Sequence, residues 1–462
     1  MGGYMRYNWI IYSIIFFVSV SYAAMSEARE PNLVLYLNGP DKSSYNLTIT
    51  LSKIDIRRGD GIWLPMFKRS VTTNSVEMTD NQILLGEFTL PPGMYNGVRI
   101  FFSAAKWIRE DKTIDLVYPE DGAEFNYAFR IKDDDIIPIF INWDVEKCIS
   151  SRIYLGECFS FEGKIPYFKS IAAYVTNEGS NNVSVIDKSR NKVISVIPAM
   201  ASPKGIVVNK EGTRGFIVNS GADTISALDL DREKVLHTFN LELGSEASAI
   251  AITPDSSKIY VCNSATDRVS VINTTTFQIL TNIPVGSKPI HLASDPKGKK
   301  VYVANYLSSD VAIIDTITNT VVGLINVEPR PIKIKVDEDG DKVYVISEAT
   351  GNISVIATST NKVIMTWQMR GRPLDLISAK GNKFFIAKTS NILSVYDHRL
   401  NIDTLTSGTG KYPWDIAMDD DIGRLYVVNR DSNSVDVFDK LTLRRIKTIQ
   451  VGKTPWQMVI VK

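Results

Sequence analysis

Polar side chains recur at one position of a short apolar segment that the C-terminal two thirds of the chain repeats. Six of the seven copies begin with proline and one with Ala247. The second residue after this leading residue is, in order, Gly205, Ala249, His291, Lys333, Asp375, Asp415 and Gln457. An imidazole placed near two carboxylates could serve general acid–base catalysis. The sequence therefore leaves open a lactonase-like or other hydrolase that uses His291, Asp375 and Asp415.

Basic residues lie within two positions of the leading residue in most copies. They are Lys204, Lys288, Arg330, Arg372, Lys411 and Lys453. If the repeated segments surround a channel, these side chains form a basic collar at its mouth, which would concentrate an acidic glycan, a phosphate or a carboxylate. The alternative is that they pair with nearby carboxylates and solvent, because surface ion pairs are common and weak.

The elements that must position these residues follow a regular repeat. Tyr174-Val175-Thr176-Asn177 returns in six further forms, which start at Phe216, Tyr260, Tyr302, Tyr344, Phe385 and Tyr426. The steps between them are 41 to 44 residues. Such a period predicts a β-propeller with one four-stranded blade per repeat.

Each repeat holds four short strands bounded by Gly, Pro, Asn or Asp, so seven repeats predict a seven-bladed ring over residues 166–462. The Tyr-Val-x-Asn segment is the second strand of its blade, and the proline-led segment is the innermost. The first repeat lacks a proline-led strand, whereas the chain ends with an extra one that starts at Pro455. We expect this last strand to complete the first blade and leave no open sheet edge.

The repeat resembles a known family. Ala173 to Asn177 followed by Val183-Ser184-Val185-Ile186-Asp187 is similar to the YVTN-type β-propeller repeats of exported bacterial and archaeal surface proteins. The resemblance implies a binding or scaffold role and carries no shared catalytic residues. Ser347 and Lys388 replace the strand-ending Asn in the fifth and sixth repeats, so we expect these two blades to be distorted.

Residues 31–165 predict a separate β-sandwich domain. Apolar and polar residues alternate with a period of two from Leu33 onward, and turns fall at Gly39-Pro40 and Gly59-Asp60-Gly61. Leu37 to Pro40, Gly61-Ile62-Trp63 and Leu90 to Tyr95 resemble a prealbumin-like sandwich domain of unknown function, which heads many exported bacterial proteins.

The first 23 residues have the pattern of a signal peptide. Arg6 is followed by an apolar run from Trp9 to Val20, and Ser21-Tyr22-Ala23 suits a signal peptidase. We expect cleavage after Ala23 and export to the periplasm or the cell surface, with no membrane span afterwards. An uncleaved N-terminal anchor is the alternative, although the run is shorter than the ~20 residues that span a bilayer.

Export affects how the three cysteines are interpreted. Cys148 and Cys158 flank Ser150-Ser151-Arg152, which we interpret as a turn between two strands, and an oxidising compartment favours a disulfide between them. A metal site is less favoured, because no second Cys or His pair is near. Cys262 lies inside a predicted strand and should be buried.

Charge and motifs narrow the functional classes. Lys and Arg number 52 against 51 Asp and Glu, a net charge of +1, which argues against nucleic acid as a general partner. No Cys-x-x-Cys-His is present for covalent haem, and the acidic run Asp337 to Asp341 reads as a hairpin turn rather than a calcium loop. We therefore expect no cofactor and no metal.

These observations predict an exported, non-catalytic binding or scaffold protein of the cell envelope. Its partner would be an envelope protein or a polysaccharide, above all an anionic glycan, recognised at one face of the propeller. Oligomeric state and the identity of the ligand stay open at this point.

Overall fold

The computed structural model describes residues 30–67, 69–110, 112–133, 135–150, 154–167, 171–379 and 382–461. The predicted signal peptide, residues 1–23, lies outside the described residues. Within the described part of the chain, no helix combines the length and the apolar character needed to cross a membrane.

The N-terminal part contains two β-sheets that share a hydrophobic core. The first has four strands in the order β10 (Phe159–Glu162), β9 (Ile137–Trp143), β1 (Leu33–Asn38) and β5 (Gln82–Phe88). The second has six strands, namely β2 (Asn46–Arg58), β3 (Trp63–Phe67), β4 (Val71–Asn74), β6 (Gly93–Arg109), β7 (Lys112–Asp115) and β8 (Ala123–Ile131). Alternate residues such as Leu35, Leu37, Ile49 and Ile54 point into this core and are buried, as the period of two predicts.

The disulfide joins Cys148 to Cys158. Ser151 and Arg152 of the predicted turn lie outside the described residues. The strands expected on either side of it are not found, because Cys148 lies in the short helix α2 (Val145–Ser150) and Cys158 follows the 3-10 turn η1 (Leu155–Glu157). Both cysteines are buried in the core of the N-terminal part. The bond therefore ties the α2 segment to β10, the edge strand of the four-stranded sheet.

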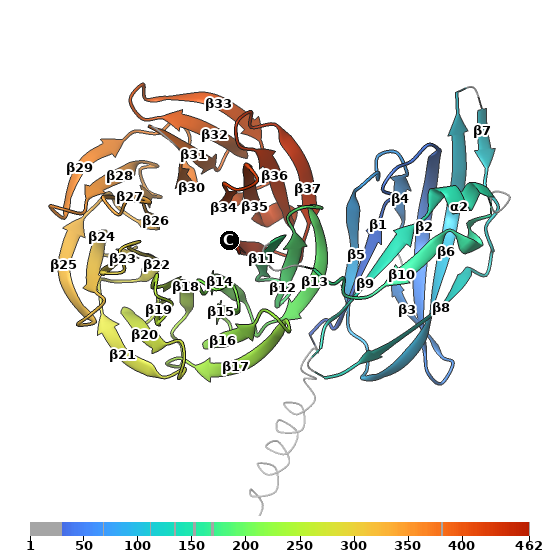
Figure 1. Cartoon of the computed structure of the whole chain (residues 1–462), viewed down its shortest axis with the longest axis horizontal. Helices are drawn as coiled ribbons and strands as arrows, with labels where there is room; N and C mark the ends of the chain where they lie inside the picture. The colour runs from blue at the N-terminus through green and yellow to red at the C-terminus, as the bar shows by residue number, and fades with distance from the viewer. Residues whose placement is uncertain are drawn as a thin grey trace, which may run out of the picture.

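The rest of the described chain forms four-stranded sheets arranged in a ring (Figure 1). The inner strands are β14 (Pro203–Val208), β18 (Ala247–Ile252), β22 (Pro289–Ser294), β26 (Pro331–Val336), β30 (Pro373–Ser378), β34 (Pro413–Asp419) and β38 (Pro455–Ile460). The second strands, which carry the Tyr-Val-x-Asn segments, are β11 (Ala172–Asn177), β15 (Arg214–Asn219), β19 (Lys258–Asn263), β23 (Lys300–Asn305), β27 (Lys342–Ser347), β31 (Lys383–Lys388) and β35 (Arg424–Asn429).

Two further strands complete each sheet toward the rim of the ring. The third strands are β12 (Asn182–Asp187), β16 (Thr224–Asp229), β20 (Arg268–Asn273), β24 (Asp310–Asp315), β28 (Ile353–Ala357), β32 (Ile392–Asp397) and β36 (Ser434–Asp439). The outer strands are β13 (Lys192–Pro198), β17 (Lys234–Asn240), β21 (Ile279–Pro284), β25 (Thr320–Asn326), β29 (Lys362–Trp367), β33 (Ile402–Gly408) and β37 (Arg445–Gln450). A short turn, η3 (Arg430–Ser432), links β35 to β36.

The last strand of the chain belongs to the same sheet as the first strand of the ring. β38 pairs antiparallel with β11, with Tyr174 opposite Val459, and it contacts the neighbouring inner strands β34 and β14. Lys188 Nζ adds a buried tie, because it donates to Asp419 Oδ2 at 2.6 Å and to the Val461 carbonyl at 3.0 Å.

The strand-ending Asn has a defined structural task. Asn177 Nδ2 donates to Asn182 Oδ1 and Ser184 Oγ across the turn to the next strand. The two sheets that lack this Asn nevertheless keep the four-strand order, so the expected distortion does not affect strand order. Ser347 Oγ donates to the Glu328 carbonyl instead, and Lys388 Nζ lies 2.6 Å from Asp403 Oδ2.

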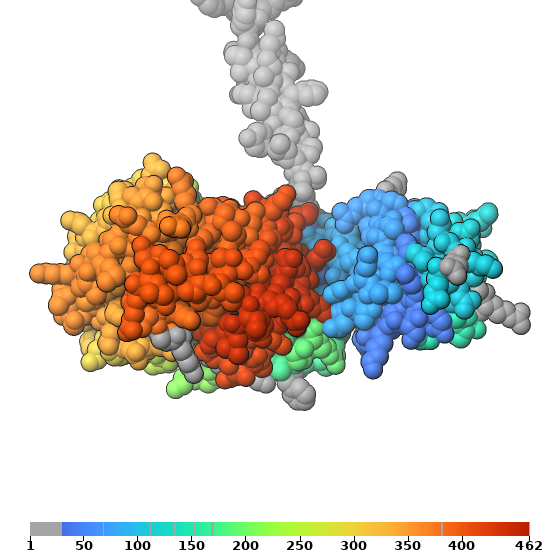
Figure 2. All heavy atoms as spheres, turned by 90° about the horizontal axis from the view of Figure 1, so that it is seen from above, coloured from blue at the N-terminus to red at the C-terminus, as the bar shows by residue number. Residues whose placement is uncertain are grey.

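The N-terminal part packs against the rim of the ring at β13 and β37 (Figures 1 and 2). Tyr36 and Phe140, on the outward face of the four-stranded sheet, join one buried cluster with Val193 and Ile449 of these strands. Both faces of this sheet are therefore buried, one in its own core and one against the ring. Asp80 reinforces the contact, with its carboxylate 3.0 Å from the Nζ atom of Lys192 and 3.3 Å from that of Lys447.

Candidate functional site

The inner strands form the edges of their sheets around the central channel. On such an edge every second backbone N–H points away from the sheet and needs another acceptor. In each inner strand, the third residue after the leading proline carries one of these N–H groups. The polar side chains identified in the sequence stand at the second residue after the leading proline. Each of them can therefore reach the N–H group of the third residue in the neighbouring inner strand.

Four of these polar side chains accept a hydrogen bond from the next inner strand. His291 Nδ1 accepts from the Ile334 N–H at 3.4 Å, and Asp375 Oδ2 accepts from the Ile416 N–H at 2.9 Å. Asp415 Oδ2 and Gln457 Oε1 do the same with Met458 and Ile206, at 3.1 Å and 3.0 Å. Each of the four therefore ties its own sheet to the following one.

Lys333 cannot accept a hydrogen bond and takes a different role. Its Nζ lies 3.0 Å from Asp415 Oδ1 and 3.8 Å from Asp375 Oδ2, and the side chain is 4% exposed. Lys335 Nζ approaches Asp375 Oδ2 at 3.3 Å. Two lysines and two aspartates thus form one cluster, in which Lys335 is 28% exposed and the other three side chains are buried.

Lys335 was missed in the sequence, although a signal was present. It is the fourth residue after its leading proline, where the other copies carry Val207, Ala251, Ala293, Ile377, Ala417 and Val459. Comparing the seven copies at this fourth position as well as at the second would have identified Lys335 as the charged residue among apolar ones.

Burial and neighbouring charges together shift the pKa values of three channel residues, His291, Asp375 and Lys335. Burial lowers the pKa of His291 well below its usual value, and Lys333 and Lys335 lower it further. Burial also raises the pKa of Asp375, against the opposing effect of the two lysines. For Lys335, burial lowers the pKa but the attraction of Asp375 and Asp415 outweighs it, so the pKa is raised. His291 is consequently neutral near pH 7.

The hydrolase arrangement expected of His291, Asp375 and Asp415 does not show a catalytic pair. Among the described residues, the His291 ring forms its hydrogen bond with the Ile334 N–H, and both carboxylates engage lysines and backbone N–H groups. Among the described residues, no three His, Cys, Asp or Glu side chains are arranged to hold a metal ion.

The six collar cations differ in their surroundings. Lys288, Arg330, Arg372, Lys411 and Lys453 are exposed and Lys204 is half-buried. Within the described part of the chain, Lys204 is the member of this set that forms an ion pair, with its Nζ 3.6 Å from Glu178 Oε1. Lys288 and Arg330 both flank the ring of Tyr306, at 5.7 Å and 5.9 Å from its centroid.

Aromatic side chains accompany these cations, and the sequence reasoning missed them. Arg430 and Lys204 both lie over the Trp456 ring, at 4.3 Å and 4.9 Å from its centroid. Trp414 packs on Trp456 with centroids 5.1 Å apart, and Tyr412 stacks on Trp414 at 5.9 Å. Trp414 and Trp456 are the first residues after their prolines, one position before the residues that the sequence comparison tracked.

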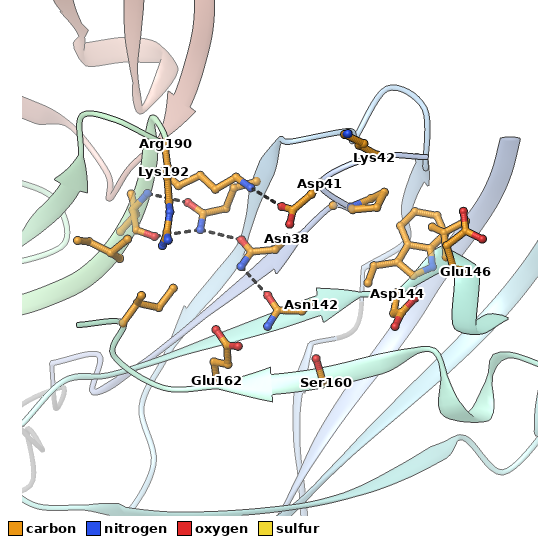
Figure 3. Close-up of a pocket in the computed structure, with 18 residues that line it drawn as sticks. Asn38, Asp41, Lys42, Asn142, Asp144, Glu146, Ser160, Glu162, Arg190 and Lys192 are labelled. Atoms are coloured by element: carbon orange, nitrogen blue, oxygen red, sulfur yellow. Dashed lines mark hydrogen bonds and ion pairs between the residues drawn. The ribbon is translucent and has the colours of Figure 1, made fainter. Parts of the chain in front are cut away.

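Cavities also lie between the N-terminal part and the ring. One of about 550 Å³ is bordered by Asn38, Asn142 and Glu162 on one side and by Arg190 and Lys192 on the other (Figure 3). Another, of about 940 Å³, is more apolar and includes Ile136, Pro138, Val196 and Met200. Because both depend on how two distant parts of the chain pack together, no local sequence pattern marks them.

Comparison with known proteins bears on the ring. A family described as YNCE-like beta-propeller matches residues 243–346. The protein is a β-propeller protein. No curated protein sequence matches the chain.

Solved structures agree with the propeller fold. A protein of unknown function from Desulfotomaculum acetoxidans is similar with a TM-score of 0.56 and 12% identity, over 63% of this chain and 99% of that one. Hydrazine synthase from Kuenenia stuttgartiensis is similar with a TM-score of 0.50 and 19% identity, over 55% and 88% of the two chains. Dihydro-heme d1 dehydrogenase NirN has a TM-score of 0.50 and 12% identity, over 64% and 76%. At these identities the likeness concerns the fold alone.

Proposed function

We propose that this β-propeller protein is an exported, non-catalytic binding protein of the cell envelope. In this proposal a β-sandwich domain precedes a seven-bladed propeller that its C-terminal strand closes, and the collar at the channel mouth binds an anionic glycan. The two N-terminal sheets around one core and the pairing of β38 with β11 support this architecture.

One observation carries the choice of ligand. Five collar cations, Lys288, Arg330, Arg372, Lys411 and Lys453, are exposed, and among the described residues none of them forms an ion pair. Because they share one place in the repeat, we expect them at the same end of the inner strands, on one face of the ring. Unpaired cations gathered around an opening produce a local positive potential although the whole chain is nearly neutral.

The channel supports a binding role over hydrolysis. Catalysis at His291 would need a carboxylate or a nucleophile within hydrogen-bond reach, whereas this imidazole accepts from a backbone N–H. Asp375 and Asp415 are already neutralised by Lys333 and Lys335. We therefore assign these channel residues to joining the sheets, and ligand binding to the collar outside them.

The test is a binding titration with polygalacturonate as an acidic glycan and dextran as a neutral one. Wild-type protein should bind polygalacturonate and not dextran, and binding should weaken as salt rises because exposed charges are screened within ~10 Å at 0.1 M ionic strength. The triple variant Arg330→Ala, Arg372→Ala and Lys411→Ala should lose at least about tenfold in affinity, which corresponds to about 1.4 kcal/mol.

A matched control removes the same number of cations from the other face. Lys210, Lys299 and Lys383 are exposed near the turns at the far ends of the inner strands, and their replacement by Ala should leave binding unchanged. Equal losses in both triple variants would indicate attraction by overall charge and would contradict a collar site. Absence of salt-dependent binding in the wild type would do the same.

A further inference from the structure

A row of four polar side chains crosses the four-stranded sheet beside the smaller interdomain cavity. Strand register sets Ser160 next to Asn142, Asn142 next to Asn38, and Asn38 next to Gln82. This row lies on the sheet face that packs against the ring, because Phe140, two residues before Asn142 on β9, contacts the ring. Four adjacent strands therefore present polar groups to one cavity.

Hydrogen bonds fix the orientation of the three amide side chains in this row. The Val193 N–H donates to Gln82 Oε1 at 3.0 Å, and Gln82 Nε2 donates to the Val193 carbonyl at 3.0 Å and to Asn38 Oδ1 at 2.9 Å. Asn38 Nδ2 then donates to Asn142 Oδ1 at 2.7 Å (Figure 3). Because a backbone N–H can only donate, Val193 determines the polarity of the whole chain of bonds.

The chain of amides ends with a donor at Asn142. Its Oδ1 is occupied by Asn38. Its Nδ2 donates to none of the described residues, so both of its hydrogens are available to another molecule. Ser160 and Glu162, both exposed on the neighbouring strand β10, lie close to Asn142 (Figure 3). A donor amide beside a hydroxyl and a carboxylate matches a ligand hydroxyl, which both donates and accepts.

The charges around the cavity favour an uncharged ligand over an anion. Three cations border it, Lys42, Arg190 and Lys192, against four carboxylates, Asp41, Asp144, Glu146 and Glu162. Lys192 Nζ is engaged, 3.0 Å from Asp80 Oδ1. Among the described residues, the bordering carboxylates Glu146 and Glu162 form no ion pair and remain as acceptors. The volume of about 550 Å³ lies within the ~300–1,000 Å³ of small-molecule sites.

We propose that this cavity binds a neutral sugar, with Asn142, Ser160 and Glu162 holding its hydroxyl groups. The site is separate from the collar in position and opposite to it in charge preference, so it does not depend on the proposed function. Arg190 and Val193 border it from the ring side. A bound sugar thus contacts both parts of the protein and stabilises their packing.

The experiment titrates the full mature chain with glucose, galactose, mannose and N-acetylglucosamine, and with glucuronate as a charged comparison. We expect at least one neutral sugar to bind saturably and to raise the melting temperature, since a ligand that binds the folded state stabilises it. Glucuronate should bind more weakly than glucose. Asn142→Ala should weaken binding of the best sugar by about tenfold, the effect of losing well-made hydrogen bonds.

Two further variants complete the test. Asn240→Ala, at an exposed end of β17, should bind the sugar as the wild type does. Glu162→Gln alters an exposed side chain, so it should fold normally and weaken binding, and it decides the question if Asn142→Ala fails to fold. The proposal is overturned if none of the neutral sugars binds saturably, or if Glu162→Gln binds as tightly as Asn240→Ala.

Discussion

The second residue after the leading proline of each inner strand shows how side chains of different chemistry can play the same structural role. His291, Asp375, Asp415 and Gln457 are an imidazole, two carboxylates and an amide, yet each offers an acceptor to a backbone N–H of the next sheet. An unmade hydrogen bond at a buried N–H costs about 1–3 kcal/mol. The shared requirement is an acceptor, which explains why side chains of such different reactivity alternate there.

Replacing His291 by Gln should keep the hydrogen bond from the Ile334 N–H and remove the titratable imidazole. Because the folded-state pKa of His291 lies below its ordinary value of 6.5, the unfolded chain binds the proton more tightly. The contribution of the neutral His291 to the free energy of unfolding is fully present above pH 6.5. It is lost as the pH falls from there through the pKa of His291 in the folded protein. Urea unfolding at pH 7.5 and pH 5.5 should therefore show a smaller acid loss in His291→Gln than in the wild type.

His398→Gln provides the comparison, because burial lowers the pKa of that histidine as well but it lies outside the channel. If His291→Gln lost as much stability on acidification as the wild type does, the neutral, hydrogen-bonded state inferred for His291 would be wrong.

At the scale of single elements, the sequence predicted the strands better than their surroundings. The Tyr-Val-x-Asn strands and the proline-led strands were located because short β-branched segments between turn residues specify strands locally. The helix α2 was missed, because a six-residue segment gives too little periodicity to separate helix from turn. The role of the channel residues was also missed, since an acceptor for the next sheet is defined only by the assembled ring.

The collar illustrates the same limit. Sequence spacing alone grouped its six cations, whereas the contacts of Lys204 with Trp456 and of Arg330 with Tyr306 join different sheets. The cavity between the N-terminal part and the ring could not be predicted from the sequence, because Gln82 and Val193 meet only when the N-terminal part packs against the rim.

The disulfide should stabilise the N-terminal part by about 2–3 kcal/mol, because it closes a short loop in the unfolded chain. Cys148→Ala combined with Cys158→Ala should lower the free energy of unfolding by that amount and lower the melting temperature. Wild-type protein treated with a reductant should follow the double variant. Both samples are measured by thermal unfolding. An unchanged melting temperature in both would show that the bond contributes nothing to stability.

At the scale of the whole molecule, the ring depends on the pairing of two strands that lie far apart in the sequence, β11 and β38. β38 supplies the inner strand of the sheet that begins with β11, and Asp415 of the preceding sheet accepts from its Met458 N–H. Deleting residues 455–462 would expose an edge of β11 and leave Asp415 without this partner. Exposed strand edges promote aggregation.

We expect the protein without residues 455–462 to aggregate or to unfold at a markedly lower temperature, measured by light scattering and circular dichroism. A chain that lacks Lys462 alone serves as the control and should behave as the wild type does. Unchanged melting of the longer deletion would contradict the structural role assigned to β38.

The pairing of β11 with β38 also determines when the protein can become folded during its synthesis. Thr176 Oγ1 donates to the Gln457 carbonyl, a contact between residues 281 positions apart. Nearly the entire ring must leave the ribosome before its first sheet finds an inner strand, and contacts so distant in sequence slow folding. The delay is compatible with the proposed export, since a translocation channel accepts an unfolded polypeptide. The order of the strands therefore leaves the first sheet of the ring without its inner strand until β38 has been synthesised.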